Sequence, residues 1–237
     1  MKFTVLIPTH NEEKRISKTL DALKNYGVVV VDDGSDSTAK IARRKGARVI
    51  HFKQRQGKGG AVMHGIRASK TRFVLLYDAD AATPPSQIPK ITREKADVVV
   101  GTRYNAKSKT NIKLHRLIAG KTFNFLARLL FGLNVSDTQC GFKLFDKKTI
   151  EPLLDECVET GFVWDVEILY RAKKAGLSIK ELPIEWREVA GGVPQAEGLV
   201  KTALRMWASL FSLRKKISAA KTKQNKQRRA TRTRRKR

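Results

Sequence analysis

Short apolar runs alternate with helical segments along the first hundred residues, and this alternation restricts the fold more than any other feature of the chain. Strands are predicted at residues 3–8, 28–31, 48–52, 73–77 and 98–100. Helices are predicted after Asn11, before Gly46, and over residues 60–69 and 87–94. Repeated β-α units of this length form a mostly parallel central sheet with helices on both faces. The chain is therefore predicted to be an α/β protein.

The rhythm changes after Gly101. A Lys-rich loop is followed by predicted helices at residues 115–130 and 166–175 and a strand pair at residues 179–186. An amphipathic helix is predicted at residues 198–213 because Met206, Trp207, Leu210 and Phe211 can share one face. Residues 1–213 are expected to form one domain, and the basic tail 214–237 is expected to be disordered.

Positive charge is the main compositional feature. The 237 residues include 49 Lys and Arg against 22 Asp and Glu, a net charge of +27, and 13 of the basic residues lie between Arg214 and Arg237. Anionic partners follow from this excess, namely nucleic acid, anionic lipid or phosphorylated substrates. A nucleic-acid-binding protein is the alternative of another class. It is disfavoured because aromatic residues make up only 7% of the chain and none lies in the tail.

Cysteine usage and hydropathy indicate the compartment. Cys140 and Cys157 lack CxxC spacing, so two free thiols are predicted rather than a disulfide framework or a zinc site. No signal peptide is recognised, and no apolar run reaches the roughly 18 residues of a membrane span. A cytoplasmic protein is expected.

Polar residues follow several predicted strands at the point where each strand ends. In open parallel sheets, ligands bind beyond the carboxyl ends of strands. Three carboxylates after the second strand would repel a pyrophosphate, which disfavours a dinucleotide site. Asp33 and Asp36 could instead bind the hydroxyls or base of a nucleoside, although Asp36 could equally cap a helix.

Asp78 and Asp80 follow the fourth predicted strand with one residue between them. In an extended backbone their side chains point the same way, and their oxygens can bind one hard divalent cation. Such a cation would neutralise a diphosphate leaving group. The pair is therefore predicted to be a metal site for Mg²⁺ or Mn²⁺.

Basic residues near these acids are candidates for binding phosphate. Lys58 and Gly59 lie in a glycine-rich segment where the backbone can approach a charged ligand, although an exposed turn explains the segment equally well. Arg103 and Arg116 have the guanidinium group that matches phosphate in a bidentate manner.

Five motifs in this order resemble family 2 glycosyltransferases. They are Ile7-Pro8-Thr9-His10-Asn11-Glu12, Val31-Asp32-Asp33-Gly34-Ser35, Gly57-Lys58-Gly59-Gly60-Ala61, Asp78-Ala79-Asp80 and Gly101-Thr102-Arg103-Tyr104. Residues 137–145 and 164–167 resemble the polyprenyl-phosphate hexosyltransferases, most closely the dolichyl-phosphate β-glucosyltransferases, with the dolichol-phosphate mannose synthases as near relatives. The resemblance covers roughly residues 1–186.

This resemblance implies a GT-A fold, a nucleoside diphosphate sugar donor such as UDP-glucose, a divalent metal ion and inversion at the anomeric carbon. It places the donor in residues 1–103, with Pro8, His10, Asn11 and Glu12 among its contacts, and the acceptor in residues 104–190. The chain departs from the family where mannose synthases often carry Gln and this chain has Ala82, which favours glucose over mannose.

A polyprenyl phosphate acceptor is an anionic nucleophile at neutral pH, so its transfer requires no catalytic base. Arg103, Arg116 and Lys143 are predicted to bind the acceptor phosphate. Asp137 and Asp165 could orient the sugar or a basic neighbour, and Asp165 could instead cap a helix. If the acceptor were a hydroxyl group of a glycan, Asp165 would be the base.

The eukaryotic glucosyltransferases of this type carry a membrane anchor at the N-terminus, which this sequence does not show. The helix ending at Leu213 and the cationic tail are therefore expected to bind the anionic cytoplasmic face of a membrane. The alternative is that the helix packs on the core.

Overall fold

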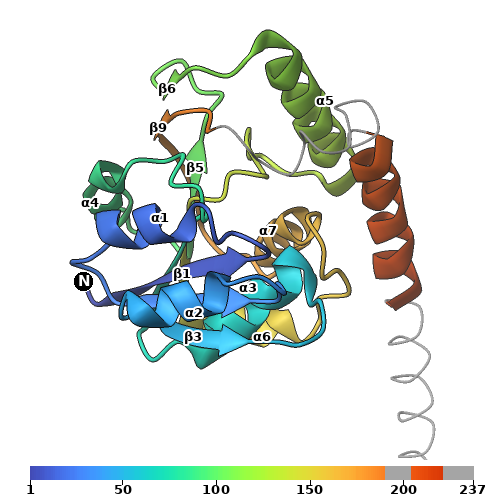
Figure 1. The fold of residues 1–237 in the computed structure, drawn as a ribbon. Coiled ribbons are helices and arrows are strands. Elements are labelled where there is room, and N and C mark those ends of the chain that lie inside the picture. Colours follow the sequence, from blue (N-terminus) through green and yellow to red (C-terminus); the bar gives the residue numbers. More distant parts are fainter. Residues whose placement is uncertain (190–203, 221–237) are drawn as a thin grey trace, which may run out of the picture.

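The computed structural model describes residues 1–189 and 204–220 and contains a seven-stranded sheet of order β3-β2-β1-β4-β7-β5-β8 (Figure 1). Its strands are β1 (Phe3–Thr9), β2 (Val28–Asp32), β3 (Arg48–His51), β4 (Phe73–Leu76), β5 (Val98–Thr102), β7 (Lys143–Asp146) and β8 (Ile179–Pro183). A small second sheet pairs β6 (Lys109–Thr110) with β9 (Glu185–Trp186). Strand β7 runs antiparallel to β4 and β5, and the other pairs of the large sheet are parallel.

Helices cover both faces of the large sheet. They are α1 (Ile16–Ala22), α2 (Thr38–Arg44), α3 (Gly57–Ala68), α4 (Ile88–Ile91), α5 (Leu114–Phe131), α6 (Lys147–Leu154) and α7 (Trp164–Lys174), with a 3₁₀ turn at Pro85–Gln87. Side chains alternate along β1, so that Leu6 packs with α3 and α7 while Val5 and Ile7 pack with α1 and α4. The predicted α/β architecture is confirmed.

Two elements were not anticipated between Gly141 and α7. Strand β7 lies between β4 and β5, and all four of its residues are buried. Helix α6 follows it directly, and Asp146 caps this helix by accepting a hydrogen bond from the Lys148 amide at 3.1 Å. Donor and acceptor halves, predicted to meet at residue 103, therefore share one sheet.

Two local predictions were wrong. Asn11 does not cap α1, because its backbone is left-handed with φ of 59° and its Oδ1 accepts a hydrogen bond from the Ser35 amide at 2.9 Å. The strands predicted at residues 179–186 do not pair with each other, because β8 joins β5 and β9 joins β6.

Residues 204–220 form one helix, which lies beside α5 in Figure 1. Leu210, Leu213 and Ile217 are buried in the core, and Arg214 Nη1 donates to the Leu130 carbonyl at 2.9 Å. The apolar face of this helix therefore packs on the protein. Disorder from residue 214 was wrongly predicted for residues 214–220. Residues 198–203 and 221–237 of the predicted helix and tail lie outside the described ranges.

None of the helices in the described ranges is both long and apolar enough to cross a membrane.

Candidate active site

A cleft of about 460 Å³ lies at the carboxyl ends of β1, β2 and β4. It is bordered by the first residues of α3 and by Arg116 in the first turn of α5. The predicted site residues that line it are Pro8, His10, Glu12, Asp33, Lys58, Asp78, Asp80 and Arg116. The predicted residues that do not line it are Asn11, Asp36, Gly59, Arg103, Asp137, Lys143 and Asp165.

The two acids that follow β4 share one environment in the cleft. Asp80 Oδ1 accepts a hydrogen bond from the Ala82 amide at 3.0 Å, which fixes the turn after the strand. Burial raises the pKa of Asp80, and the negative charge of Asp78 raises it further. Burial alone would raise the pKa of Asp78 as well, but the charge and hydrogen bond of Lys58 hold it below its ordinary value. The two carboxylates therefore interact with each other and with one ammonium group.

A chain of alternating charges leads from the cleft into the core. Lys58 Nζ lies 3.1 Å from Asp78 Oδ1 and 3.9 Å from Asp165 Oδ2. Asp165 Oδ1 in turn lies 2.5 Å from Lys143 Nζ, which also donates to the Cys140 carbonyl at 2.6 Å. The Lys143 side chain is fully buried, so the prediction that it contacts the acceptor phosphate was wrong: it holds Asp165 instead.

Arg103 forms a bidentate ion pair with Asp137. Its Nε and Nη2 donate to the two carboxylate oxygens at 2.7 and 2.8 Å, and Asp137 is fully buried. The guanidinium group also lies over the rings of Tyr104 and Trp186. This bidentate pair fixes the end of β5, and it uses the hydrogen-bonding edge that an acceptor phosphate would need.

Arg116 lies at the cleft, where its Nη1 donates to Glu188 Oε1 at 2.7 Å. Burial would raise the pKa of Glu188, but the hydrogen bond and charge of Arg116 lower it below its ordinary value. Of the three basic residues predicted to bind the acceptor phosphate, Arg116 is the one whose side chain lines the cleft.

Asp33 organises the other end of the cleft. Its Oδ2 accepts hydrogen bonds from the amides of Gln56 and Gly57 at 2.7 and 2.8 Å, and its Oδ1 lies 2.9 Å from His10 Nδ1. Because Asp33 caps α3, this helix begins at Gly57 rather than at the predicted residue 60. Hydrogen bonds within the protein therefore already fix the Asp33 carboxylate before any nucleoside binds to it.

Backbone groups of the first turn of α3 are also occupied within the protein. The amide of Gly59 donates to the Gly161 carbonyl at 3.3 Å, and that of Gly60 donates to the Thr160 carbonyl at 3.0 Å. A Cβ atom at Gly59 would overlap the Trp164 side chain, so this glycine is required for packing. A diphosphate in the cleft would therefore be bound by side chains more than by the helix N-terminus.

Asp36 caps a helix. Its Oδ1 accepts hydrogen bonds from the amide and hydroxyl of Thr38 at 2.9 and 2.5 Å, and its Oδ2 accepts one from the Glu13 amide at 3.1 Å. Burial would raise the pKa of Asp36, but these hydrogen bonds lower it. Asp36 therefore caps α2 through Thr38 and joins this helix to the loop that carries Glu13.

The cleft offers two ligands to a divalent cation. No group of three His, Cys, Asp or Glu side chains suited to a metal ion occurs in residues 1–189 and 204–220. Mg²⁺ is commonly bound by one or two carboxylates together with substrate phosphates and water. Asp78 and Asp80 fit that arrangement, because a cation would remove the repulsion between the two carboxylates.

A family model described as glycosyl transferase family 2 matches residues 4–154, which include all the strand ends of the cleft. The chain belongs to glycosyltransferase family 2.

Two relatives of this family 2 transferase carry the same name. Dolichyl-phosphate beta-glucosyltransferase of Dictyostelium discoideum is 29% identical over 252 residues, covering 89% of this chain and 76% of that protein. Dolichyl-phosphate beta-glucosyltransferase of Homo sapiens is 30% identical over 222 residues, covering 80% of this chain and 68% of that protein.

Solved structures share the fold of this family 2 transferase. Glucosyl-3-phosphoglycerate synthase from Mycobacterium tuberculosis in complex with UDP is 21% identical with a TM-score of 0.69, covering 90% of this chain and 80% of that one. The same synthase with Mn²⁺, UDP-glucose and phosphoglyceric acid is 19% identical with a TM-score of 0.69, covering 90% and 79%. The GT-A fold expected from the motifs is confirmed.

Several residues of the family 2 site were not identified from the sequence. Arg15 lines the cleft and makes two hydrogen bonds to Glu12 at 2.6 and 2.7 Å. Its third nitrogen, Nη1, is buried without a hydrogen-bond partner. A single Arg in a basic chain carries no sequence signal, but its position one turn after Glu12 could have indicated the pair.

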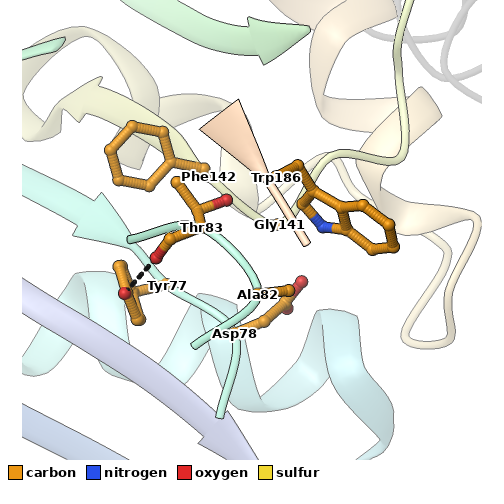
Figure 2. A pocket seen from close by; sticks show the side chains of 7 residues that line it. All are labelled: Tyr77, Asp78, Ala82, Thr83, Gly141, Phe142 and Trp186. Atoms are coloured by element: carbon orange, nitrogen blue, oxygen red, sulfur yellow. Dashed lines mark hydrogen bonds between the residues drawn. The ribbon is translucent and has the colours of Figure 1, made fainter. Parts of the chain in front are cut away.

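Gly141 packs closely against the Asp78 carboxylate. A Cβ atom at this position would overlap the Asp78 carboxylate. Figure 2 shows the two residues in a smaller pocket that Ala82 and Trp186 also line. The close approach of a glycine to the acid explains why the segment after Cys140 belongs to the site.

Proposed function

We propose that this chain transfers a hexose, with glucose favoured and mannose next, from a nucleoside diphosphate sugar such as UDP-glucose to a polyprenyl or dolichyl phosphate. One observation carries the proposal. The cleft joins the acidic pair Asp78 and Asp80 to the cations Lys58 and Arg116, whereas the carboxylate that would act as a base, Asp165, is buried behind them. The names of the relatives at 29% and 30% identity agree with this reading.

The donor would lie along the strand ends. Asp33 and His10 border the nucleoside end, and Asp78 and Asp80 border the diphosphate end. Mg²⁺ or Mn²⁺ held by these two acids would supply charge neutralisation for the departing diphosphate. Lys58 pairs with Asp78, and Arg15, which pairs with Glu12, acts on Asp80 through its charge. Both add positive charge that requires no rearrangement during the reaction.

The reaction on this proposal is a single displacement. An oxygen of the acceptor phosphate forms a bond to the anomeric carbon, the bond from that carbon to the donor diphosphate breaks, and the nucleoside diphosphate leaves with the electron pair. The acceptor is a phosphate monoester with a second pKa of about 6, so at neutral pH no proton has to be removed. The protein therefore contributes alignment and charge, with Arg116 directed to the acceptor phosphate.

A hydroxyl acceptor would require a base. Asp165, which the sequence offered for that role, is 1% exposed and is held by Lys143 and Lys58. Its position therefore favours the phosphate acceptor.

The test incubates the purified protein with UDP-glucose or GDP-mannose and a polyprenyl phosphate, with and without Mn²⁺, and identifies the glycolipid by mass spectrometry. Arg116→Ala should raise KM for the acceptor without changing KM for the donor. Arg93→Ala removes an exposed arginine outside the cleft and serves as the matched control. Failure to form glycolipid from either donor would refute the proposal.

A lipid acceptor requires contact with a membrane, and we place the protein at its cytoplasmic face as a peripheral protein. Residues 221–237 add cationic charge that anionic lipids attract. The helix at 204–220 contributes less than the sequence suggested, because its apolar face packs on the core.

A further inference from the structure

The outward face of α5 carries four large apolar side chains that the described residues 1–189 and 204–220 leave exposed. Their exposed fractions are 70% for Leu114, 58% for Ile118, 62% for Phe125 and 68% for Leu129. Spacings of four, seven and four residues place them on one side of the helix. We call these four residues the α5 stripe.

The inner side of α5 is apolar as well. Phe123, Ala127 and Phe131 are buried in the core of the protein. A helix that is apolar on two sides normally has a partner on both. Core packing accounts for the inner side, whereas the part of the chain that the structure describes does not cover the α5 stripe.

The two segments that carry and flank the stripe are rich in positive charge, although Glu188 pairs with Arg116 at one end and Glu159 pairs with Lys216 of the neighbouring helix. Residues 104–136 include no Asp or Glu. They include six basic residues, namely Lys107, Lys109, Lys113, Arg116, Lys121 and Arg128. The neighbouring helix at 204–220 also lacks acids and carries four basic residues, and its Phe211 is 50% exposed. The partner of this surface should therefore combine an apolar layer with negative charge.

We propose that the α5 stripe docks on an anionic lipid bilayer, with α5 lying in the plane of the membrane. The apolar side chains would enter the boundary between head groups and acyl chains, and Lys121 and Arg128 would contact anionic head groups. Apolar burial combined with positive charge is the arrangement by which interfacial helices bind membranes.

Other occupants fit the surface less well. A second copy related by a two-fold axis would bring the same mainly basic surface against itself, so that like charges face each other. Nucleic acid would match the charge, but aliphatic side chains provide no stacking platform for bases. An anionic bilayer satisfies both the apolar and the charged parts of the surface.

The position of the stripe suits the proposed reaction, and in this respect alone the inference rests on the proposed function. Arg116 lies in the first turn of α5 and lines the cleft, while the stripe occupies the outer side of the same helix. Docking of α5 would therefore bring the acceptor end of the cleft close to the membrane that holds a lipid phosphate.

The test measures sedimentation of the full chain with phosphatidylcholine vesicles that contain or lack phosphatidylserine. Phe125→Ser combined with Leu129→Ser should lower the partition coefficient roughly 100-fold, since each side chain contributes about one factor of ten. Val158→Ser removes an exposed apolar side chain outside α5 and should leave binding unchanged. Because both stripe residues are exposed, circular dichroism and thermal unfolding should match the unsubstituted protein.

Charge is tested separately. Lys121→Gln combined with Arg128→Gln should lower binding to phosphatidylserine vesicles roughly 30-fold and leave binding to phosphatidylcholine unchanged. The stripe variant is also measured at high salt, which suppresses any contribution from residues 221–237.

Vesicle binding that is unaffected by the stripe variant would overturn the proposal. The same holds if the stripe variant changes only the oligomeric state in light scattering, or only binding to a duplex DNA probe. Activity separates the two proposals. If the stripe variant still glucosylates a short water-soluble polyprenyl phosphate but loses activity on the long-chain lipid in vesicles, both are supported. If no acceptor is glucosylated while vesicle binding depends on the stripe, the proposed function fails and the docking stands.

Discussion

Asp165→Asn tests whether the buried acid behind the cleft is structural or chemical. The substitution removes the negative charge that faces Lys143, which is fully buried, and leaves its ammonium group with neutral acceptors, namely the new amide oxygen and the Cys140 carbonyl. Breaking one partner of a buried ion pair costs about 3–5 kcal/mol. For a chain of this size, each kcal/mol lowers Tm by roughly 2–4 °C. We therefore expect Tm to fall by roughly 6–20 °C.

Urea and thermal denaturation measure this loss of stability. A double variant and a surface control show whether it comes from the unpaired charge. Asp165→Leu combined with Lys143→Met removes both charges, and stability should return to within about 2 kcal/mol of the original. Asp155→Asn breaks the surface pair with Arg67, in which Asp155 is largely exposed, and should cost less than about 1 kcal/mol.

The opposite pattern would refute this account of Asp165. If Asp165→Asn retained full stability but lost transfer to a polyprenyl phosphate, the carboxylate would have a chemical role despite its burial, and a base would have to be included in the mechanism.

Three further predictions concern the two proposed metal ligands, Gly141 and the two thiols. Asp78→Asn and Asp80→Asn should each weaken Mn²⁺ binding in the presence of UDP by calorimetry, and unchanged affinity would exclude the pair as metal ligands. Gly141→Ala should displace the Asp78 carboxylate and lower turnover by roughly 100-fold with an unchanged circular dichroism spectrum; full activity would contradict the close packing. Burial raises the pKa of the Cys140 and Cys157 thiols to about 12, so both stay protonated at pH 8 and should resist a thiol reagent until the protein is unfolded. Rapid labelling of the native protein at pH 8 would contradict the burial of these thiols.

The strand ends could be predicted because the apolar runs locate the strands and the polar residues directly follow them. Apolar runs predicted β1, β2 and β4, and the rule that ligands bind beyond parallel strands then brought Asp33 and Asp78 to one cleft. The structure agrees on both residues.

Strand β7 was missed because its four buried residues include a lysine and an aspartate at its ends. Charged residues in a short apolar run favour the prediction of a loop. No local pattern in the sequence indicates that Lys143 forms an ion pair with Asp165, twenty-two residues later. The same lack of pairing information explains why Lys143 and Arg103 were expected at a phosphate. Burial and partner choice arise from tertiary contacts, which no local pattern contains.

The position of β7 in the sheet has a consequence for biosynthesis. Strand β5 bonds to β7 and β8, and both follow it in the chain by forty residues or more. On the ribosome, the apolar segment Val98–Thr102 would emerge long before β7 and β8, so neither of its native neighbours would be present to pair with it. Nascent chains of intermediate length therefore expose an unpaired apolar strand that is prone to aggregate. We expect a chaperone that binds extended apolar segments to bind these nascent chains until β8 has been synthesised.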